Sequence, residues 1–200
     1  VALDKGPFDL SVRDGAMELQ LTGAGMTVSG EAALNGVPLV IDWEENFSGS
    51  TFDRRFTVTG VADAKARQDL GIDDLPVAGG VMAGEVSHTV FPGGRSETVA
   101  KIDLTNASLD FPIIRWRKSA SIPGNLYVFL TADPSGETVV EDLRLDASDM
   151  KLAARIEAAP DLKSLKTLEF RTLEFAGNSM QGRVRVAEDG GLDIDLTGAR

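Results

Sequence analysis

Few side chains of this 200-residue chain could take part in catalysis. His88 is the only histidine, and the chain has no cysteine. A zinc site built on histidines, or a nucleophile activated by a histidine base, would depend on His88. No second histidine and no Ser-x-Gly elbow lies near it. We therefore expect His88 to be an ordinary sheet residue.

Two pairs of adjacent carboxylates, Glu44-Glu45 and Asp73-Asp74, are the other candidates for acid–base chemistry. Glycoside hydrolysis needs two carboxyl groups that face each other across a substrate. Neighbouring residues of a strand point to opposite faces, and Asp73-Asp74 lies in a loop flanked by glycine and proline. No glycine-rich phosphate loop or calcium-loop spacing is present. We expect neither an enzyme nor a metal or cofactor site.

A run of basic and aromatic residues, Arg115 to Lys118, differs from the acidic background. Such a run suits contact with a lipid headgroup or a membrane surface. The alternative, which we favour, is a solvated edge strand with protective charges and with Trp116 turned into the core. Trp43 is expected to be a packing anchor, with Glu44 and Glu45 solvated beside it.

Composition limits the class of protein. Hydrophobic residues make up 42% of the chain and charged residues 26%, which is typical of a folded domain. Thirty-one acidic and twenty basic residues give a formal net charge of -11, so nucleic acid is not an expected partner. No stretch approaches the roughly 18 apolar residues of a membrane-spanning helix. Because the chain begins at Val1 and stops directly after a strand-like run, we expect residues 1–200 to form one internal segment of a longer protein.

Alternating hydrophobicity predicts a mainly β fold. From Met26 to Leu34 apolar residues occupy every second position, and the pattern recurs between turn residues along the chain. Asp14-Gly15 and Asn35-Gly36 suit two-residue hairpin turns. One short helix is predicted from Ala64 to Leu70, with Asp63 as N-cap and Gly71 as its exit, and a second short helical turn from Pro160 to Leu165. Roughly 12 to 15 strands with one apolar face are expected, with a bulge near Thr172.

That apolar face must either pack against another part of the protein or bind a ligand. A two-layer sandwich or a barrel would bury it internally, and the pattern taken alone favours these closed forms. An open, curved gutter would instead leave a slot suited to acyl chains. The two forms differ in function, because a closed module of the cell envelope would serve a structural or interaction role.

Several sequence runs, in order, resemble one family. The run from Leu34 to Phe47 fits the pattern G-x-P-x-x-x-x-W-x-E-x-F of the AsmA-like family (YhdP/TamB-type) of large periplasmic β-groove proteins of Gram-negative bacteria. Later runs are similar to that family's next elements: Arg55–Gly60 with the helix and Gly71, Ile102–Ala107, Trp116–Lys118 with Pro123-Gly124, Phe175–Gly177, Met180–Gly182 and Leu196–Arg200. The resemblance covers nearly the whole chain, although no anchor helix or terminal docking element is part of it.

The resemblance implies a long, curved antiparallel sheet of hairpins, a half-pipe with one or two short helices. It further implies an inner-membrane-anchored periplasmic protein whose groove moves phospholipid between the inner and outer membranes. Other segments of the same chain and envelope proteins at the ends would be its partners. Bulk and face then give the predicted groove lining: Met26, Val28, Leu39, Ile41, Phe56, Val58, Ile102, Leu104, Val128, Leu143, Leu152, Val184 and Ile194.

Overall fold

The computed structural model describes residues 12–49, 51–72, 76–158, 165–187 and 191–199. Twelve strands form one antiparallel sheet, in which every strand pairs with the next one of the series. These strands are β1 (Val12–Leu21), β2 (Gly25–Leu34), β3 (Val37–Asn46), β4 (Arg54–Ala62), β6 (Met82–Val90), β7 (Ser96–Asp103), β10 (Gly124–Ala132), β11 (Thr138–Ala147), β12 (Met150–Ala158), β13 (Leu165–Phe175), β14 (Asn178–Val186) and β15 (Leu192–Ala199).

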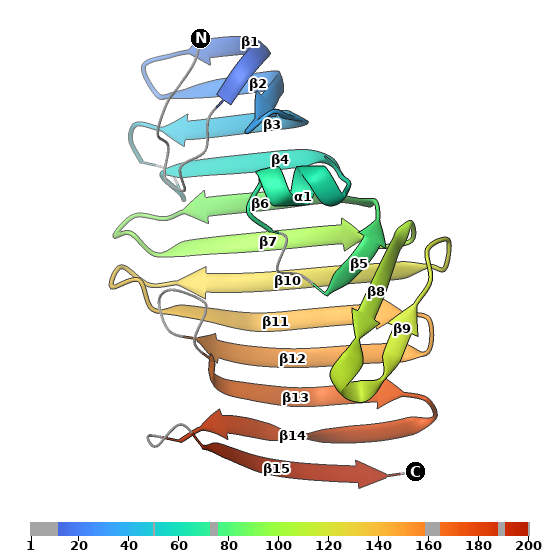
Figure 1. Ribbon diagram of the computed structural model, residues 1–200. Coiled ribbons are helices and arrows are strands. Elements are labelled where there is room, and N and C mark those ends of the chain that lie inside the picture. The colour runs from blue at the N-terminus through green and yellow to red at the C-terminus, as the bar shows by residue number, and fades with distance from the viewer. Residues whose placement is uncertain (1–11, 50, 73–75, 159–164, 188–190, 200) are drawn as a thin grey trace.

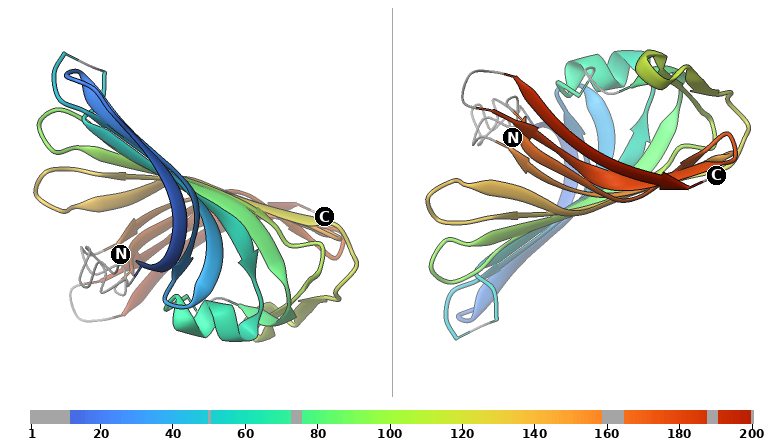
Figure 2. Two further views of the ribbon diagram at one scale, coloured as in Figure 1. Left: turned by 90° about the horizontal axis from the view of Figure 1, so that it is seen from above. Right: turned by 90° about the horizontal axis from the view of Figure 1, so that it is seen from below.

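The large sheet is open, with β1 at one edge and β15 at the other (Figure 1). Figure 2 shows that it twists and curves along its length. The predicted fold class, a long curved antiparallel sheet with a short helix, is therefore confirmed. The closed sandwich or barrel that alternation alone favours is wrong, because alternation reports that one face is apolar and not what covers it.

Two insertions leave the series of hairpins. Between β4 and β6 lie helix α1 (Ala64–Asp69) and strand β5 (Val77–Gly80); between β7 and β10 lie β8 (Ala107–Phe111), the single-turn 3-10 helix η1 (Pro112–Ile114) and β9 (Trp116–Lys118). Strands β5, β8 and β9 form a small antiparallel sheet. Figures 1 and 2 place α1 and this small sheet on one side of the large sheet, over one end of its strands.

The helix begins where its sequence predicts and ends at Asp69, one residue before the predicted end, with Leu70 as its C-cap. The Asp63 carboxylate accepts a hydrogen bond from the Ala66 backbone N–H at 2.8 Å, and Gly71 follows with φ of +70°. The Arg67 guanidinium is buried and donates to the Gly80 carbonyl at 3.2 Å, which ties the helix to β5. No described helix has the length and apolar character needed to cross a membrane.

Turn predictions had mixed outcomes. Asn35 and Gly36 both adopt positive φ and connect β2 to β3, as a two-residue hairpin requires. The turn predicted at Asp14-Gly15 was wrong. Strand β1 continues through these residues, and its register with β2 shifts between Arg13 and Ala16. A bulge accommodates the same positive φ within a strand. The helical turn predicted near Pro160 lies mainly outside the described residues, whereas the bulge near Thr172 is confirmed in β13.

Candidate functional site

Strand pairing places apolar side chains in rows that cross the whole large sheet. Residues directly opposite each other in an antiparallel pair point to the same face, as do residues two apart in one strand. The first row consists of Leu19, Val28, Trp43, Phe56, His88, Thr98, Leu130, Val140, Ile156, Leu168, Val184 and Ile194. One side chain from each of the twelve strands contributes.

Two further rows run parallel to the first on the same face. The second row consists of Met17, Gly30, Ile41, Val58, Val86, Ala100, Val128, Leu143, Ala154, Phe170, Gly182 and Leu196. The third row consists of Ala32, Leu39, Gly60, Gly84, Ile102, Leu126, Leu145, Leu152, Leu173, Met180 and Gly198. We call the surface formed by these rows the apolar face.

All thirteen residues of the predicted groove lining lie on the apolar face. Eleven belong to the three rows: Val28, Phe56, Val184 and Ile194 to the first, Ile41, Val58, Val128 and Leu143 to the second, and Leu39, Ile102 and Leu152 to the third. Met26 lies beyond the first row and Leu104 beyond the third. The predicted lining residues thus lie on one face, but other elements of the structure cover only part of that face.

One end of the apolar face is a closed core. The small sheet packs Leu109 and Trp116 against Leu104, Leu145 and Met150. Leu104 is only 3% exposed there. Helix α1 packs Ala66 and Leu70 against the buried cluster of Ala32, Val37, Leu39 and Ile41. These elements cover part of the third row: Ala32, Leu39 and Leu145 are buried, whereas most of its other members are half-buried.

The first two rows are mostly not sealed. Most of their members are half-buried, and Val86, in the middle of the second row, is 39% exposed. Exposure rises at the two edge strands, where Leu19 and Leu196 are exposed and Ile194 reaches 56%. An apolar strip of this length on a protein surface is the kind of feature that marks a binding site.

Polar groups interrupt the apolar face near the ends of β3, β4 and β6. His88 Nδ1 lies 2.9 Å from Thr98 Oγ1, and burial together with the nearby Arg54 cation lowers the pKa of His88. The Trp43 ring stacks on Phe56 at a centroid distance of 5.0 Å, as expected of a packing anchor. The Trp43 Nε1 atom is buried and has no hydrogen-bond partner among the described residues.

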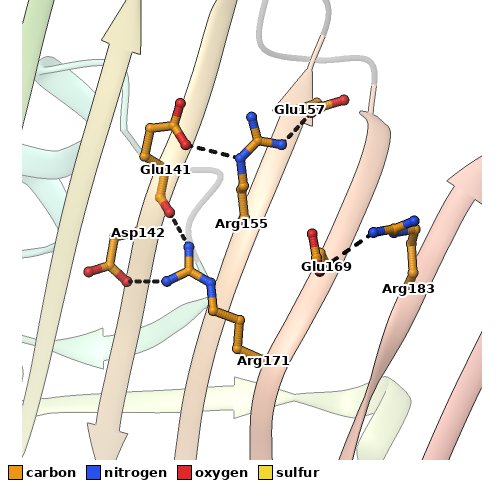
Figure 3. A network of polar contacts seen from close by, with 7 residues as sticks. All are labelled: Glu141, Asp142, Arg155, Glu157, Glu169, Arg171 and Arg183. Carbon is orange, nitrogen blue, oxygen red and sulfur yellow. Dashed lines mark hydrogen bonds and ion pairs between the residues drawn. The ribbon is translucent and has the colours of Figure 1, made fainter.

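The opposite face of the sheet is polar and carries charge networks. In Figure 3, Arg155 of β12 contacts Glu141 at 3.0 Å and Glu157, while Arg183 pairs with Glu169 at 3.5 Å. An open cleft of about 890 Å3 on this side is lined mainly by charged and polar residues of β13, β14 and β15. This face suits contact with water, not with acyl chains.

The basic run after η1 includes β9, an edge strand of the small sheet as expected, but one of its cations is buried. Trp116 is buried, as predicted, and its Nε1 donates to Asp149 at 2.8 Å. Arg117 is solvated and pairs with Asp110 at 3.0 Å. Lys118 was wrongly expected to be solvated: it is 1% exposed, and its ammonium donates to the carbonyl oxygens of Leu104 at 2.7 Å and Ala107 at 2.8 Å. Alternation with Trp116 was the signal that could have found it, because residues two apart share a face.

The remaining candidate residues from the sequence are His88 and the Asp73-Asp74 pair. His88 lies in β6, as expected of a sheet residue. The Asp73-Asp74 pair lies outside the described residues. Within the described ranges, no group of three or more histidine, aspartate or glutamate side chains is placed to hold a metal ion.

Among the described residues, the apolar face is therefore the surface from which we argue a function. Comparison of the chain with protein-family models, with curated proteins and with solved structures finds no match.

Proposed function

We propose that the apolar face carries the acyl chains of phospholipid. The observation behind this proposal is the first row, to which each of the twelve strands contributes a side chain in register, and which only partial cover shields from solvent. Burial of each acyl methylene contributes about 0.8 kcal/mol, so a strip of valine, leucine, isoleucine and phenylalanine offsets removal of a lipid tail from a membrane. No catalytic group is needed for this process.

The shape of the strip favours movement along it. The rows run across the strands, so a lipid that moves from one strand to the next meets a similar apolar environment at each strand. A ligand bound nearly equally at neighbouring positions can slide without crossing a high barrier. The polar opposite face keeps the ribbon soluble while the lipid headgroup stays in water.

The sequence resemblance extends this proposal to a cellular role. We infer a segment of a periplasmic, inner-membrane-anchored bridge that conducts phospholipid between the inner and outer membranes. Neighbouring segments of the same chain would continue the strip, and envelope proteins would receive the lipid at its ends. These assignments rest on the runs from Leu34 to Phe47 and beyond that resemble the AsmA-like family.

Mass spectrometry of organic extracts from the purified chain tests the carriage of lipid. We expect co-purified phospholipid. A photo-crosslinking residue at Val86 should trap that lipid, whereas one at the adjacent Glu85, on the polar face, should not. An envelope interaction module without a lipid ligand would give empty extracts and equal, low crosslinking at both positions, and that result would refute the proposal.

A further inference from the structure

We propose that the end of the apolar face away from α1 and the small sheet holds a zwitterionic lipid headgroup, with its phosphate at Arg54 and its ammonium group at Glu45. This inference rests on the proposed carriage of lipid and adds a position, an orientation and a headgroup class. It rests on two charged side chains, those of Glu45 and Arg54, which lie on a face made mainly of apolar residues.

Glu45 and Arg54 are direct partners across β3 and β4. They lie on the apolar face, one step beyond the first-row residues Trp43 and Phe56. Side chains at such positions are about 4.5–5.5 Å apart at Cβ. Yet neither side chain makes a hydrogen bond or an ion pair with another described residue, although Glu45 is half-buried. Two opposite charges of this kind, at the margin of an apolar surface, complement a ligand that carries both charges a few bonds apart.

A donor without a partner among the described residues belongs to the neighbouring first-row residue of β3. The Trp43 Nε1 atom is buried without an acceptor among the described residues, on the same face as Glu45 and two residues before it. Buried donors without partners are rare, because they lose their hydrogen bonds to water. A phosphate or ester oxygen of a lipid would supply the missing acceptor. Nδ1 of His88, in contrast, lies 2.9 Å from Thr98 Oγ1.

The net charge of the chain favours one headgroup class, and the position of Glu45 and Arg54 on the apolar face sets the orientation of the lipid. The chain carries a net charge of -11, which disfavours amphiphiles with a net negative charge, whereas the Glu45–Arg54 pair sums to zero. From Arg54, β4 runs toward the covered end through Phe56 of the first row and then Val58 of the second row. The headgroup at Glu45 and Arg54 therefore directs the acyl chains toward α1.

Tryptophan quenching by brominated lipids tests the site. The chain has two tryptophans, and in a Trp116→Phe background Trp43 is the sole reporter. The probes are short-chain phosphatidylcholine and phosphatidylglycerol below their micelle concentrations, each brominated either near the glycerol or near the terminal methyl. We expect stronger quenching by the glycerol-proximal bromine, and phosphatidylcholine binding about threefold to tenfold tighter than phosphatidylglycerol, as one exposed charge contact gives.

Two neighbouring substitutions should act in opposite directions. Arg54→Gln should weaken binding of both probes, because each carries a phosphate. Glu45→Gln should strengthen phosphatidylglycerol binding and abolish the preference for phosphatidylcholine. Arg185→Gln, an exposed arginine of the polar face, is the matched control and should change neither. Trp43→Phe keeps the ring and removes the donor, and calorimetry should show weaker binding of both probes.

The outcomes separate this inference from the proposed function. If neither probe binds, lipid carriage fails and the headgroup site fails with it. If both bind equally well and Arg54→Gln and Glu45→Gln change nothing, the headgroup site is overturned while lipid carriage stands. Stronger quenching by bromine near the terminal methyl would reverse the orientation and would also overturn the site.

Discussion

Lys118 places a cation in the core between the two sheets. Its ammonium donates to backbone carbonyls of residues around the β7–β8 connection, and burial lowers the pKa of this amine. Because Lys118 extends from β9, these hydrogen bonds fix the small sheet over the covered end of the apolar face. A buried donor that satisfies several carbonyl groups contributes more to folding stability than a surface charge does, because its removal leaves buried acceptors without a hydrogen bond.

Lys118→Met retains the length of the side chain and removes the donor. We expect it to lower the free energy of unfolding by about 1–3 kcal/mol. Arg117→Met, one residue earlier and solvated, should change it by less than about 1 kcal/mol. Urea denaturation followed by circular dichroism measures both. Equal stability of Lys118→Met and the parent would mean that desolvation of the ammonium outweighs its hydrogen bonds.

His88 is a second residue whose environment can be read directly, because a single histidine gives one set of imidazole signals in NMR. Burial first, and the Arg54 cation second, lower its pKa below 6.5 in the folded state. The unfolded chain therefore binds more protons just below pH 6.5. His88 contributes stability that is fully present above pH 6.5 and is lost as the pH falls toward the folded pKa.

Titration by NMR should give a His88 pKa below 6.5, and Arg54→Gln should raise it because one cause of the depression is removed. The Arg185→Gln control, on the opposite face, should leave it unchanged. A folded-state pKa at or above 6.5, or no response to Arg54→Gln, would contradict the placement of Arg54 beside His88.

At the scale of elements, the covering layer depends on local sequence. Helix α1 has only six residues, so its capping contributes much of its local stability. Its Asp63 cap, its buried Arg67 and the hydrogen bond from Asn35 Nδ2 to the Asp69 carbonyl at 2.9 Å hold it against β5 and the β2–β3 turn. Loss of any one of them should loosen the cover over the third row.

Asp63→Ala removes the acceptor for the Ala66 N–H and should cost about 1 kcal/mol of unfolding free energy, as N-cap losses usually do. Gln68→Ala, on the exposed side of the same helix, is the control and should be neutral. Hydrogen exchange at the helix amides should rise in the first variant alone. Unchanged exchange and stability would show that packing of Ala66 and Leu70, not the cap, holds the helix.

The local sequence predicted the strands, the turn and the helix better than it predicted which elements pack over the large sheet. The alternation from Met26 to Leu34, the Asn35-Gly36 turn and the Asp63 cap each specify a nearby backbone conformation, and each was confirmed. Asp14-Gly15 formed a bulge because pairing with β2 continues on both sides of it. Strand β5 pairs with β8 across a long stretch of chain, and no local pattern encodes that partner. Strands β8 and β9 form a local hairpin, in which alternation with Trp116 places Lys118 on the buried face.

On the scale of the whole molecule, alternation identified the apolar face and resemblance indicated that it is open. Face assignment follows from a period of two, so all thirteen predicted lining residues could be placed on one side. Their exposure could not be predicted, because it depends on where α1 and the small sheet lie. The result is a face with a sealed end at Leu104 and an accessible strip at Val86.

Val86→Asp tests whether that strip acts as a continuous route for lipid. Val86 is already 39% exposed, so its carboxylate can reach water and the fold should survive, while the charge interrupts the second row where a lipid tail would lie. We expect co-purified phospholipid to fall at least several-fold by mass spectrometry. Val40→Asp is the matched control: Val40 is 44% exposed, on the opposite face, and should retain parental lipid. Equal lipid content in the two variants, both with parental thermal stability, would mean that the apolar face is not the surface on which lipid travels.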